Sequence, residues 1–397
     1  MAPELKPTDV GGCRVRLADF STLTEALEYA ALSRAGFNFY SGRGELLSAL
    51  PYRDLRDQAE SLARRMIRAG LHPGERVAII AETSADFVRA FCASQYAALV
   101  PVPLPTPAAF AGRVNYIDHI HPMMAAARPS AVLAPGVFLD SVRQAAADLD
   151  VDLLGTFADL ERLPEAGADL PPVKPDDVCY LQFSSGSTRS PTGVAVTHGA
   201  LLANARGIAR DALQVTGGDR CTSWLPFYHD MGLVGCLLVP VTNQLSTDCL
   251  APDEFARRPL IWPTLISRNG GTLSYSPSFG YDLCARRATN AELEHLDLST
   301  WRVAGIGGDV ARLCAERAKP QLGQELLDLD YHEDKDADVD LNLVMTGSGA
   351  LIEVQAGGEE ATFQRDQLDR LLNLGKQGIE AITRAQKTTL GANWPLD

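Results

Sequence analysis

The clearest candidate for chemistry is a serine- and glycine-rich stretch that follows a short apolar run. Its small side chains would let backbone N–H groups and hydroxyls approach a polyphosphate, which large side chains would block. The Gly-Lys-Ser/Thr ending of a Walker loop is absent. The stretch therefore predicts a nucleotide-phosphate site, with a plain solvent loop as the alternative. Its candidate residues are Ser184, Ser185, Gly186, Ser187, Thr188, Arg189 and Gly193.

A second candidate is the sequence FYHDMG, in which His229 stands beside Asp230. An imidazole titrates near neutral pH and can serve a site, whereas a lone histidine in an aromatic stretch is more often structural. Two further stretches, LSYSPSFGYDLC and WRVAGIGGD, combine a strand pattern with turn residues. The candidates in these three stretches are His229, Asp230, Met231, Gly232, Ser276, Pro277, Gly307, Gly308 and Asp309.

Alternating helices and strands must position these residues. Apolar spacing predicts helices over residues 54–70 and 85–98, the second with Ser84 as N-cap, and another over 363–390. Short apolar runs predict strands at 76–80, 129–134, 178–183 and 301–306. The proline-rich run 100–107 should be extended, and residues 164–175 should form an exposed connection. The pattern indicates an α/β fold.

Composition excludes several classes of protein. With 397 residues and 46% apolar content the chain can bury a substantial core, and no run of about 20 uncharged apolar residues could span a bilayer. The N-terminus has no secretory signal pattern, so we expect a cytoplasmic protein with reduced cysteines. A net charge of -14 disfavours unspecific binding to RNA or DNA.

The run LQFSSGSTRSPTGVAVTHGALLAN resembles the phosphate-binding loop of the adenylate-forming superfamily, and its Arg-Ser-Pro variant resembles that of fatty acyl-AMP ligases. Three other blocks agree in order: TSWLPFYHDMGLVG, LSYSPSFGYDLCARRA, and the segment from Pro51 to Glu82 with QYAALVPVPLP. The resemblance covers about residues 15 to 310. It implies that a fatty acid and ATP are converted to acyl-adenylate and pyrophosphate, and that the acyl group passes to an acyl carrier protein or polyketide synthase.

The same resemblance implies roles for the candidate residues. The stretch from Ser184 to Arg189, with Gly193 and residues 307–309, would bind ATP with magnesium. Thr188 and His229 would be catalytic. Residues 229–232, Ser276 and Pro277 would bind the fatty acid. Thr192 and Arg189 depart from the lysine and glycine of many superfamily members, as the acyl-AMP ligase branch allows.

After residue 310 the superfamily pattern stops, since no ribose-binding aspartate motif and no C-terminal catalytic lysine motif can be found. Residues 322–391 instead resemble the C-terminal part of ribonuclease PH, a phosphorolytic 3′ exoribonuclease. That resemblance places Asp334 and Asp340 at metal-binding positions, although a solvated acidic turn is the alternative. The N-terminal half of that family, with its RNA-contacting arginines, has no counterpart here.

We therefore predict an incomplete adenylate-forming domain over residues 1–310, a junction over 311–321 and a small α+β appendage over 322–397. Adenylation should be weak or absent, with residual ATP or fatty-acid binding. The alternatives are phosphorolysis or RNA binding through the C-terminal segment, and a non-catalytic fusion or rearrangement product. The appendage lacks its usual partner half, so it should dock on the first domain or mediate self-association.

Overall fold

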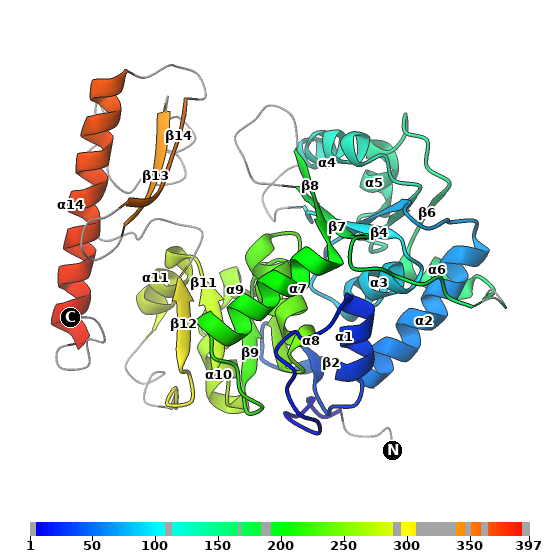
Figure 1. Ribbon diagram of the computed structural model, residues 1–397, viewed down its shortest axis with the longest axis horizontal. Helices are drawn as coiled ribbons and strands as arrows, with labels where there is room; N and C mark the ends of the chain where they lie inside the picture. Colours follow the sequence, from blue (N-terminus) through cyan, green and yellow to red (C-terminus); the bar gives the residue numbers. More distant parts are fainter. Residues whose placement is uncertain are drawn as a thin grey trace. The chain divides into compact units, whose positions relative to one another are not determined.

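The computed structural model describes residues 5–107, 113–165, 167, 169–183, 192–288, 295–306, 339–345, 351–358 and 364–390. The chain divides into two units, one made of residues 1–186, 190–276 and 283–305, the other of 187–189, 277–282 and 306–397. Helices and strands alternate along the first unit (Figure 1). The α/β class predicted from the sequence is confirmed, whereas the predicted boundaries at 310 and 322 stay a prediction.

A four-stranded parallel sheet forms the first layer of strands, in the order β4-β3-β5-β6. Its strands are β3 (Arg76–Ile80), β4 (Val100–Leu104), β5 (Ala131–Leu133) and β6 (Leu153–Gly155). The N–H of Val100 points toward β3 and donates to the Glu75 carbonyl (2.8 Å). Successive N–H groups of a strand point to opposite sides, so an N–H at Pro101 or Pro103 would point away from β3. Proline is tolerated in such an edge strand because no ladder hydrogen bond is lost.

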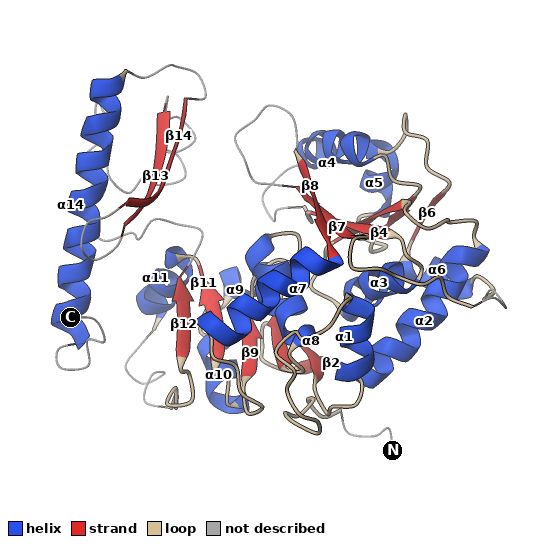
Figure 2. Cartoon of the chain, viewed as in Figure 1, coloured by secondary structure: helices blue, strands red, loops and turns tan. Residues whose placement is uncertain are grey.

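A six-stranded sheet follows the order β12-β11-β9-β10-β1-β2; Figure 2 labels β12, β11, β9 and β2 of this sheet. Its strands are β1 (Gly36–Tyr40), β2 (Leu46–Pro51), β9 (Arg220–Ser223), β10 (Ser246–Leu250), β11 (Leu273–Ser276) and β12 (Val303–Ile306). β1, β10, β9 and β11 run parallel, and β2 returns antiparallel to β1. A separate hairpin pairs β7 (Val178–Phe183) with β8 (Gly193–Thr197).

Helices connect these strands, and several begin at a serine or threonine whose side chain caps the first turn. Ser84 accepts a hydrogen bond from the Phe87 N–H at the start of α3, as expected, and Thr156 forms a capping box with Asp159. The α-helices are α1 (Leu23–Ala30), α2 (Tyr52–Arg68), α3 (Ala85–Tyr96), α4 (Arg113–Ala127), α5 (Leu139–Ala145), α6 (Phe157–Arg162), α7 (His198–Arg206), α8 (Val239–Thr242), α9 (Pro252–Arg257), α10 (Ile261–Asn269) and α11 (Ser278–Arg287). Two π-helices, η1 (Gly207–Ala212) and η2 (Met231–Leu238), interrupt the pattern.

The main hydrophobic core joins both sheets to α1, α2 and α3. Phe37, Tyr52 and Phe87 are fully buried in it, and Phe37 meets Tyr52 edge-on with ring centroids 5.5 Å apart. Burying an aromatic side chain of this size contributes about 2–3 kcal/mol, which is why these alternating segments collapse onto one another. In the described part of the chain, no helix combines the length and apolar character that crossing a bilayer requires.

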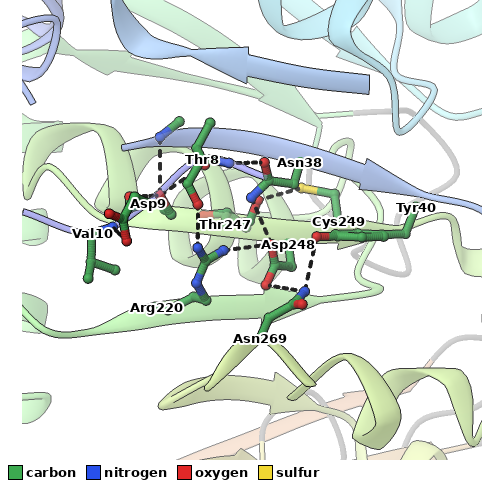
Figure 3. Close-up of polar contacts among 12 residues, drawn as sticks. Thr8, Asp9, Val10, Asn38, Tyr40, Arg220, Thr247, Asp248, Cys249 and Asn269 are labelled. Carbon is green, nitrogen blue, oxygen red and sulfur yellow. Dashed lines mark hydrogen bonds and ion pairs between the residues drawn. The ribbon is translucent and has the colours of Figure 1, made fainter. Parts of the chain in front are cut away.

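A buried polar network ties three strands, α10 and the N-terminal segment together (Figure 3). The fully buried carboxylate of Asp248 on β10 accepts from Arg220 Nη1 and Asn38 Nδ2, both at 2.8 Å, and from Asn269 Nδ2 at 3.0 Å. Thr8 donates its N–H to Asn38 Oδ1 (2.7 Å), and its carbonyl accepts from Arg220. Removing one partner of a buried ion pair costs about 3–5 kcal/mol, so this network holds residues 8–9 against the sheet.

The second unit contains a β-hairpin and a long helix. β13 (Val339–Met345) pairs antiparallel with β14 (Leu351–Gly358), and α14 (Arg365–Leu390) contacts β13. The helix predicted over residues 363–390 is confirmed as α14, and the predicted junction over 311–321 lies outside the described residues. Self-association through this segment stays a prediction.

Candidate functional site

Ligands of parallel α/β sheets bind beyond the carboxyl ends of the strands. β9 and β11 are parallel neighbours, so the chain leaves the same edge of the sheet after Ser223 and after Ser276. The predicted residues 229–232 follow β9, and Ser276 is the last, fully buried residue of β11. Pro277 precedes α11 and accepts a hydrogen bond from the Gly280 N–H (3.0 Å). Gly307, Gly308 and Asp309 follow β12 and lie outside the described residues.

His229 and Asp230 form the charged part of this edge. His229 Nδ1 lies 2.6 Å from Asp230 Oδ1, and the same carboxylate oxygen accepts from the Met231 N–H (2.7 Å) as the N-cap of η2. The hydrogen bond to Asp230 raises the pKa of His229, and the same hydrogen bond lowers the pKa of Asp230. His229 is 42% exposed, so its imidazolium can attract an anionic ligand such as a carboxylate.

Gly232 closes the loop that presents His229. A Cβ at this position would lie 2.0 Å from the Pro226 carbonyl oxygen and 2.8 Å from its carbonyl carbon. The turn is also held by hydrogen bonds from the His229 N–H to the Pro226 carbonyl (3.2 Å) and from the Leu233 N–H to the His229 carbonyl (2.7 Å). Only glycine fits here, and the loop is fixed by backbone contacts on both sides of His229.

The serine-glycine stretch joins β7 to β8. Its residues Ser184 to Arg189, including Thr188, lie outside the described residues, but the hairpin that carries it is well defined. The last pair of this hairpin is Phe183 with Gly193, which begins β8 and is exposed. A backbone connection of residues 184–192 therefore starts and ends at a fixed pair of positions.

β7 reaches the His229 loop directly. Gln182 Nε2 donates to the Tyr228 carbonyl (3.4 Å), one residue before His229. The pKa of Tyr180, also on β7, is raised mainly by burial and further by the nearby charge of Asp230. The end of the strand that leads into the serine-glycine stretch thus lies beside the His229–Asp230 pair.

Among the described residues, no group of three His, Cys, Asp or Glu side chains could hold a metal ion. The two predicted metal ligands are not tested by this finding. Asp334 lies outside the described residues, and Asp340 lies on β13 opposite Gly357, with its side chain not described. A metal site in the C-terminal segment stays a prediction.

Sequence reasoning missed two polar groups of the first unit. His198, the first residue of α7, is buried, and its Nδ1 accepts from the Leu23 N–H (3.1 Å). Asp248 stands within a buried strand, where a charge requires a partner. A carboxylate inside the strand pattern Ser246–Leu250 was the signal that could have revealed the network.

The first unit has the α/β fold of adenylate-forming enzymes. The sequence model of AMP-binding enzymes matches residues 40–329, and the chain belongs to this family. A separate match, to domain 2 of the 3′ exoribonuclease family, covers residues 322–378 and confirms the second resemblance seen in the sequence. The exoribonuclease alternative rests on this shorter match alone.

Curated relatives agree with the family. A Caulobacter vibrioides protein described as an acyl-CoA synthetase is 52% identical over 299 residues, which are 75% of this chain and 52% of that protein. The 4-hydroxyphenylalkanoate adenylyltransferase of Mycobacterium marinum is 32% identical over 326 residues, 78% of this chain and 50% of the relative. The chain spans about half the length of the curated relatives it matches.

Solved structures show the same fold. A structure from a study of fatty acyl-adenylate ligases of E. coli and L. pneumophila matches with a TM-score of 0.73 and 48% identity, over 75% of this chain and 54% of that one. The L. pneumophila fatty acyl-adenylate ligase in complex with acyl adenylate and pyrophosphate matches with a TM-score of 0.64 and 26% identity, over 76% and 52%. The first unit has the adenylate-forming fold that the sequence predicted.

Proposed function

We propose that this chain binds a fatty acid and ATP at the carboxyl edge of β9 and β11 and forms acyl-adenylate and pyrophosphate at a low rate. The observation that carries the proposal is the hydrogen bond from Gln182 to the Tyr228 carbonyl, which ties the strand before the serine-glycine stretch to the His229 loop. Relatives support the substrate class, since one is a medium-chain-fatty-acid–[acyl-carrier-protein] ligase of Moorena producens. The acceptor proposed here is likewise an acyl carrier protein or polyketide synthase.

The proposed reaction is an in-line displacement. A carboxylate oxygen of the fatty acid attacks the α-phosphorus of ATP, the bond from that phosphorus to the bridging oxygen breaks, and pyrophosphate leaves. Such a reaction depends on positioning and on neutralising charge. The backbone and hydroxyl donors of residues 184–188 would hold the β- and γ-phosphates, and Thr188 would act there with them.

His229 supplies a positive charge for binding the carboxylate of the fatty acid. Its raised pKa keeps the imidazolium populated nearer to neutral pH, so the ring can hold the fatty-acid carboxylate against its repulsion from the phosphates. Asp230 fixes the ring from its Nδ1 side. Magnesium enters the proposal only as the ion that accompanies ATP.

Low turnover follows from the sequence after residue 310, which lacks the ribose-binding aspartate and catalytic lysine motifs of the family. Binding and turnover are therefore separate expectations. We expect the purified chain to bind a non-hydrolysable acyl-adenylate analogue, and to show fatty-acid-dependent ATP–pyrophosphate exchange far below that of a full-length relative.

The matched test compares His229→Ala with His119→Ala, which removes an exposed histidine of α4. A hydrogen bond to a charged group contributes about 1.5–3 kcal/mol, so His229→Ala should weaken binding of the free fatty acid by about 10- to 100-fold. His119→Ala should leave it unchanged. Equal affinities for both variants would contradict the role of His229, and absence of binding by the unmodified chain would favour the non-catalytic alternative.

A further inference from the structure

An open hollow of about 340 Å³ lies in the first unit, and its lining consists of Arg16, Leu17, Asp19, Arg206 and Arg210. Arg16 and Asp19 precede α1, Arg206 ends α7, and Arg210 belongs to η1. None of these residues belongs to the His229 loop or to the β7–β8 hairpin. The proposed adenylation site therefore makes no use of them.

The hollow is positively charged on a chain whose net charge is -14. Three guanidinium groups in its lining face one carboxylate, that of Asp19. The Asp19 carboxylate lies 3.9 Å from Arg16 Nη2 and 3.8 Å from Arg206 Nη2, which is beyond hydrogen-bond distance, and its side chain is largely exposed. Such long, solvated contacts neutralise little charge.

The guanidinium of Arg206 makes few hydrogen bonds within the described residues. Its Nε is buried and has no hydrogen-bond partner among the described residues, and its Nη2 makes only a long contact of 3.4 Å to the Ala18 carbonyl. The Arg206 side chain as a whole is 38% exposed, so the outer nitrogens of its guanidinium can donate to a ligand in the hollow.

The other two arginines differ in how they are held. The Arg16 guanidinium lies 4.3 Å from the ring centroid of Phe20 and donates to the Asp19 carbonyl (2.7 Å), so its orientation is fixed. Arg210 donates to both carboxylate oxygens of Asp211, at 2.8 and 3.1 Å, in an exposed pair. An exposed pair of this kind contributes at most about 1 kcal/mol, so an anion can replace Asp211 at low cost.

The backbone is strained at Leu17, which lines the hollow, and at the next residue, Ala18. Leu17 and Ala18 have φ angles of 47° and 56°, the left-handed region that side chains other than glycine's rarely adopt. The Ala18 N–H donates to the Thr242 carbonyl (3.1 Å), which holds the turn in place. Strained positions of this kind cost about 1–3 kcal/mol each and cluster at ligand sites.

We propose that this hollow binds a small phosphate oxyanion, with Arg206 and Arg210 as the donors and Arg16 as a fixed positive charge. Guanidinium forks match phosphate oxygens in pairs, which favours this class over other anions. The volume stands at the lower end of the range for small-molecule sites, about 300–1,000 Å³, so it suits pyrophosphate or orthophosphate better than a whole nucleotide. The proposal does not depend on adenylation.

Arginine footprinting with phenylglyoxal on the full chain tests it, because peptide mass spectrometry reads each arginine separately. Saturating pyrophosphate should slow modification of Arg206 and Arg210 by at least about fivefold and leave Arg143, an exposed arginine of α5, unchanged. Orthophosphate in a parallel arm shows whether a single phosphate suffices; protection by either anion supports the proposal. Equal protection of all three arginines, or protection of Arg189 alone, would overturn it.

A variant pair provides the second readout. Arg206→Gln should raise the pyrophosphate concentration that half-protects Arg210 by about tenfold or more, because the variant loses hydrogen bonds to a charged ligand. Arg143→Gln should leave that concentration unchanged. Far-UV circular dichroism checks that both variants fold. An unchanged pyrophosphate dependence in folded Arg206→Gln would show that the hollow does not hold the anion.

Discussion

Replacing Gly232 with alanine tests how tightly the His229 loop is closed. The new Cβ would lie 2.0 Å from the Pro226 carbonyl oxygen, and the three nearest atoms all belong to the backbone of residues 225–226. Backbone cannot rotate away as a flexible side chain does, so the start of η2 has to separate from the loop. Overpacking costs about 1–3 kcal/mol, and the exchange of glycine for alanine in a helix returns at most about 1 kcal/mol. We expect a net loss of about 2 kcal/mol.

Gly235→Ala is the matched control, three residues along the same π-helix. Its Cβ would meet only the ring of Tyr275, at 3.9 Å, an ordinary van der Waals distance. The change in backbone entropy is the same in both variants, so the difference between them isolates the clash. We expect the stability of Gly235→Ala to be unchanged or raised by up to about 1 kcal/mol.

The assay is unfolding in urea, followed by tryptophan fluorescence and far-UV circular dichroism. Trp224 lies at the beginning of the loop and is buried, so its emission should report the local rearrangement in Gly232→Ala. The urea midpoint should fall for Gly232→Ala at an unchanged slope, and it should not fall for Gly235→Ala. Equal midpoints for the two variants would refute the inference that backbone contact closes the loop.

Two further predictions concern the first unit. Burial lowers the pKa of His198 to about 4, so between about pH 6.5 and 4 the unfolded chain binds a proton that the native chain does not, and the free energy of unfolding falls by up to about 3 kcal/mol. His198→Asn can still accept from Leu23, and its melting temperature should fall less on acidification; parallel Tm–pH curves would contradict this. Asp219→Ala removes a 2%-exposed carboxylate that accepts from Arg302 at 2.6 and 2.8 Å, and should cost about 3 kcal/mol in urea unfolding. Asp140→Ala, at an exposed pair 3.9 Å long, should cost less than about 0.5 kcal/mol, and similar losses in the two would count against a buried ion pair.

Local rules explain why much of the fold could be predicted. α3 begins after Ser84 because a serine oxygen satisfies a free N–H of the first turn, and β3 follows from four consecutive apolar residues, Val77 to Ile80, which are all buried. The alternation of valine and proline predicted an extended chain over 100–107. It also explains why β4 lies at the edge of its sheet, because Pro101 and Pro103 cannot donate hydrogen bonds to a further strand on the side away from β3.

Long-range pairing could not be predicted in the same way. The His229–Asp230 contact joins neighbouring residues, so a sequence pattern can indicate it. The contact of Gln182 with Tyr228 joins residues 46 positions apart, which no local pattern reveals. The partners of Asp248 come from β1, β9 and α10, so a pattern along one strand cannot identify them. The π-helical geometry of η2 also has no period that a helix or strand template would detect.

The buried polar network around Asp248 determines when the N-terminal segment can take up its native position during synthesis. Thr8 cannot form its native contacts until Ser246, Asp248 and Arg220 have been synthesised. Ser246, whose hydroxyl contacts that of Thr8, lies 238 residues further along the chain. At about 5–20 residues per second the ribosome needs roughly 12–50 s to make that stretch. Residues 8–9 therefore leave the exit tunnel long before their binding surface exists, and the six-stranded sheet can close around them only after β10 has emerged.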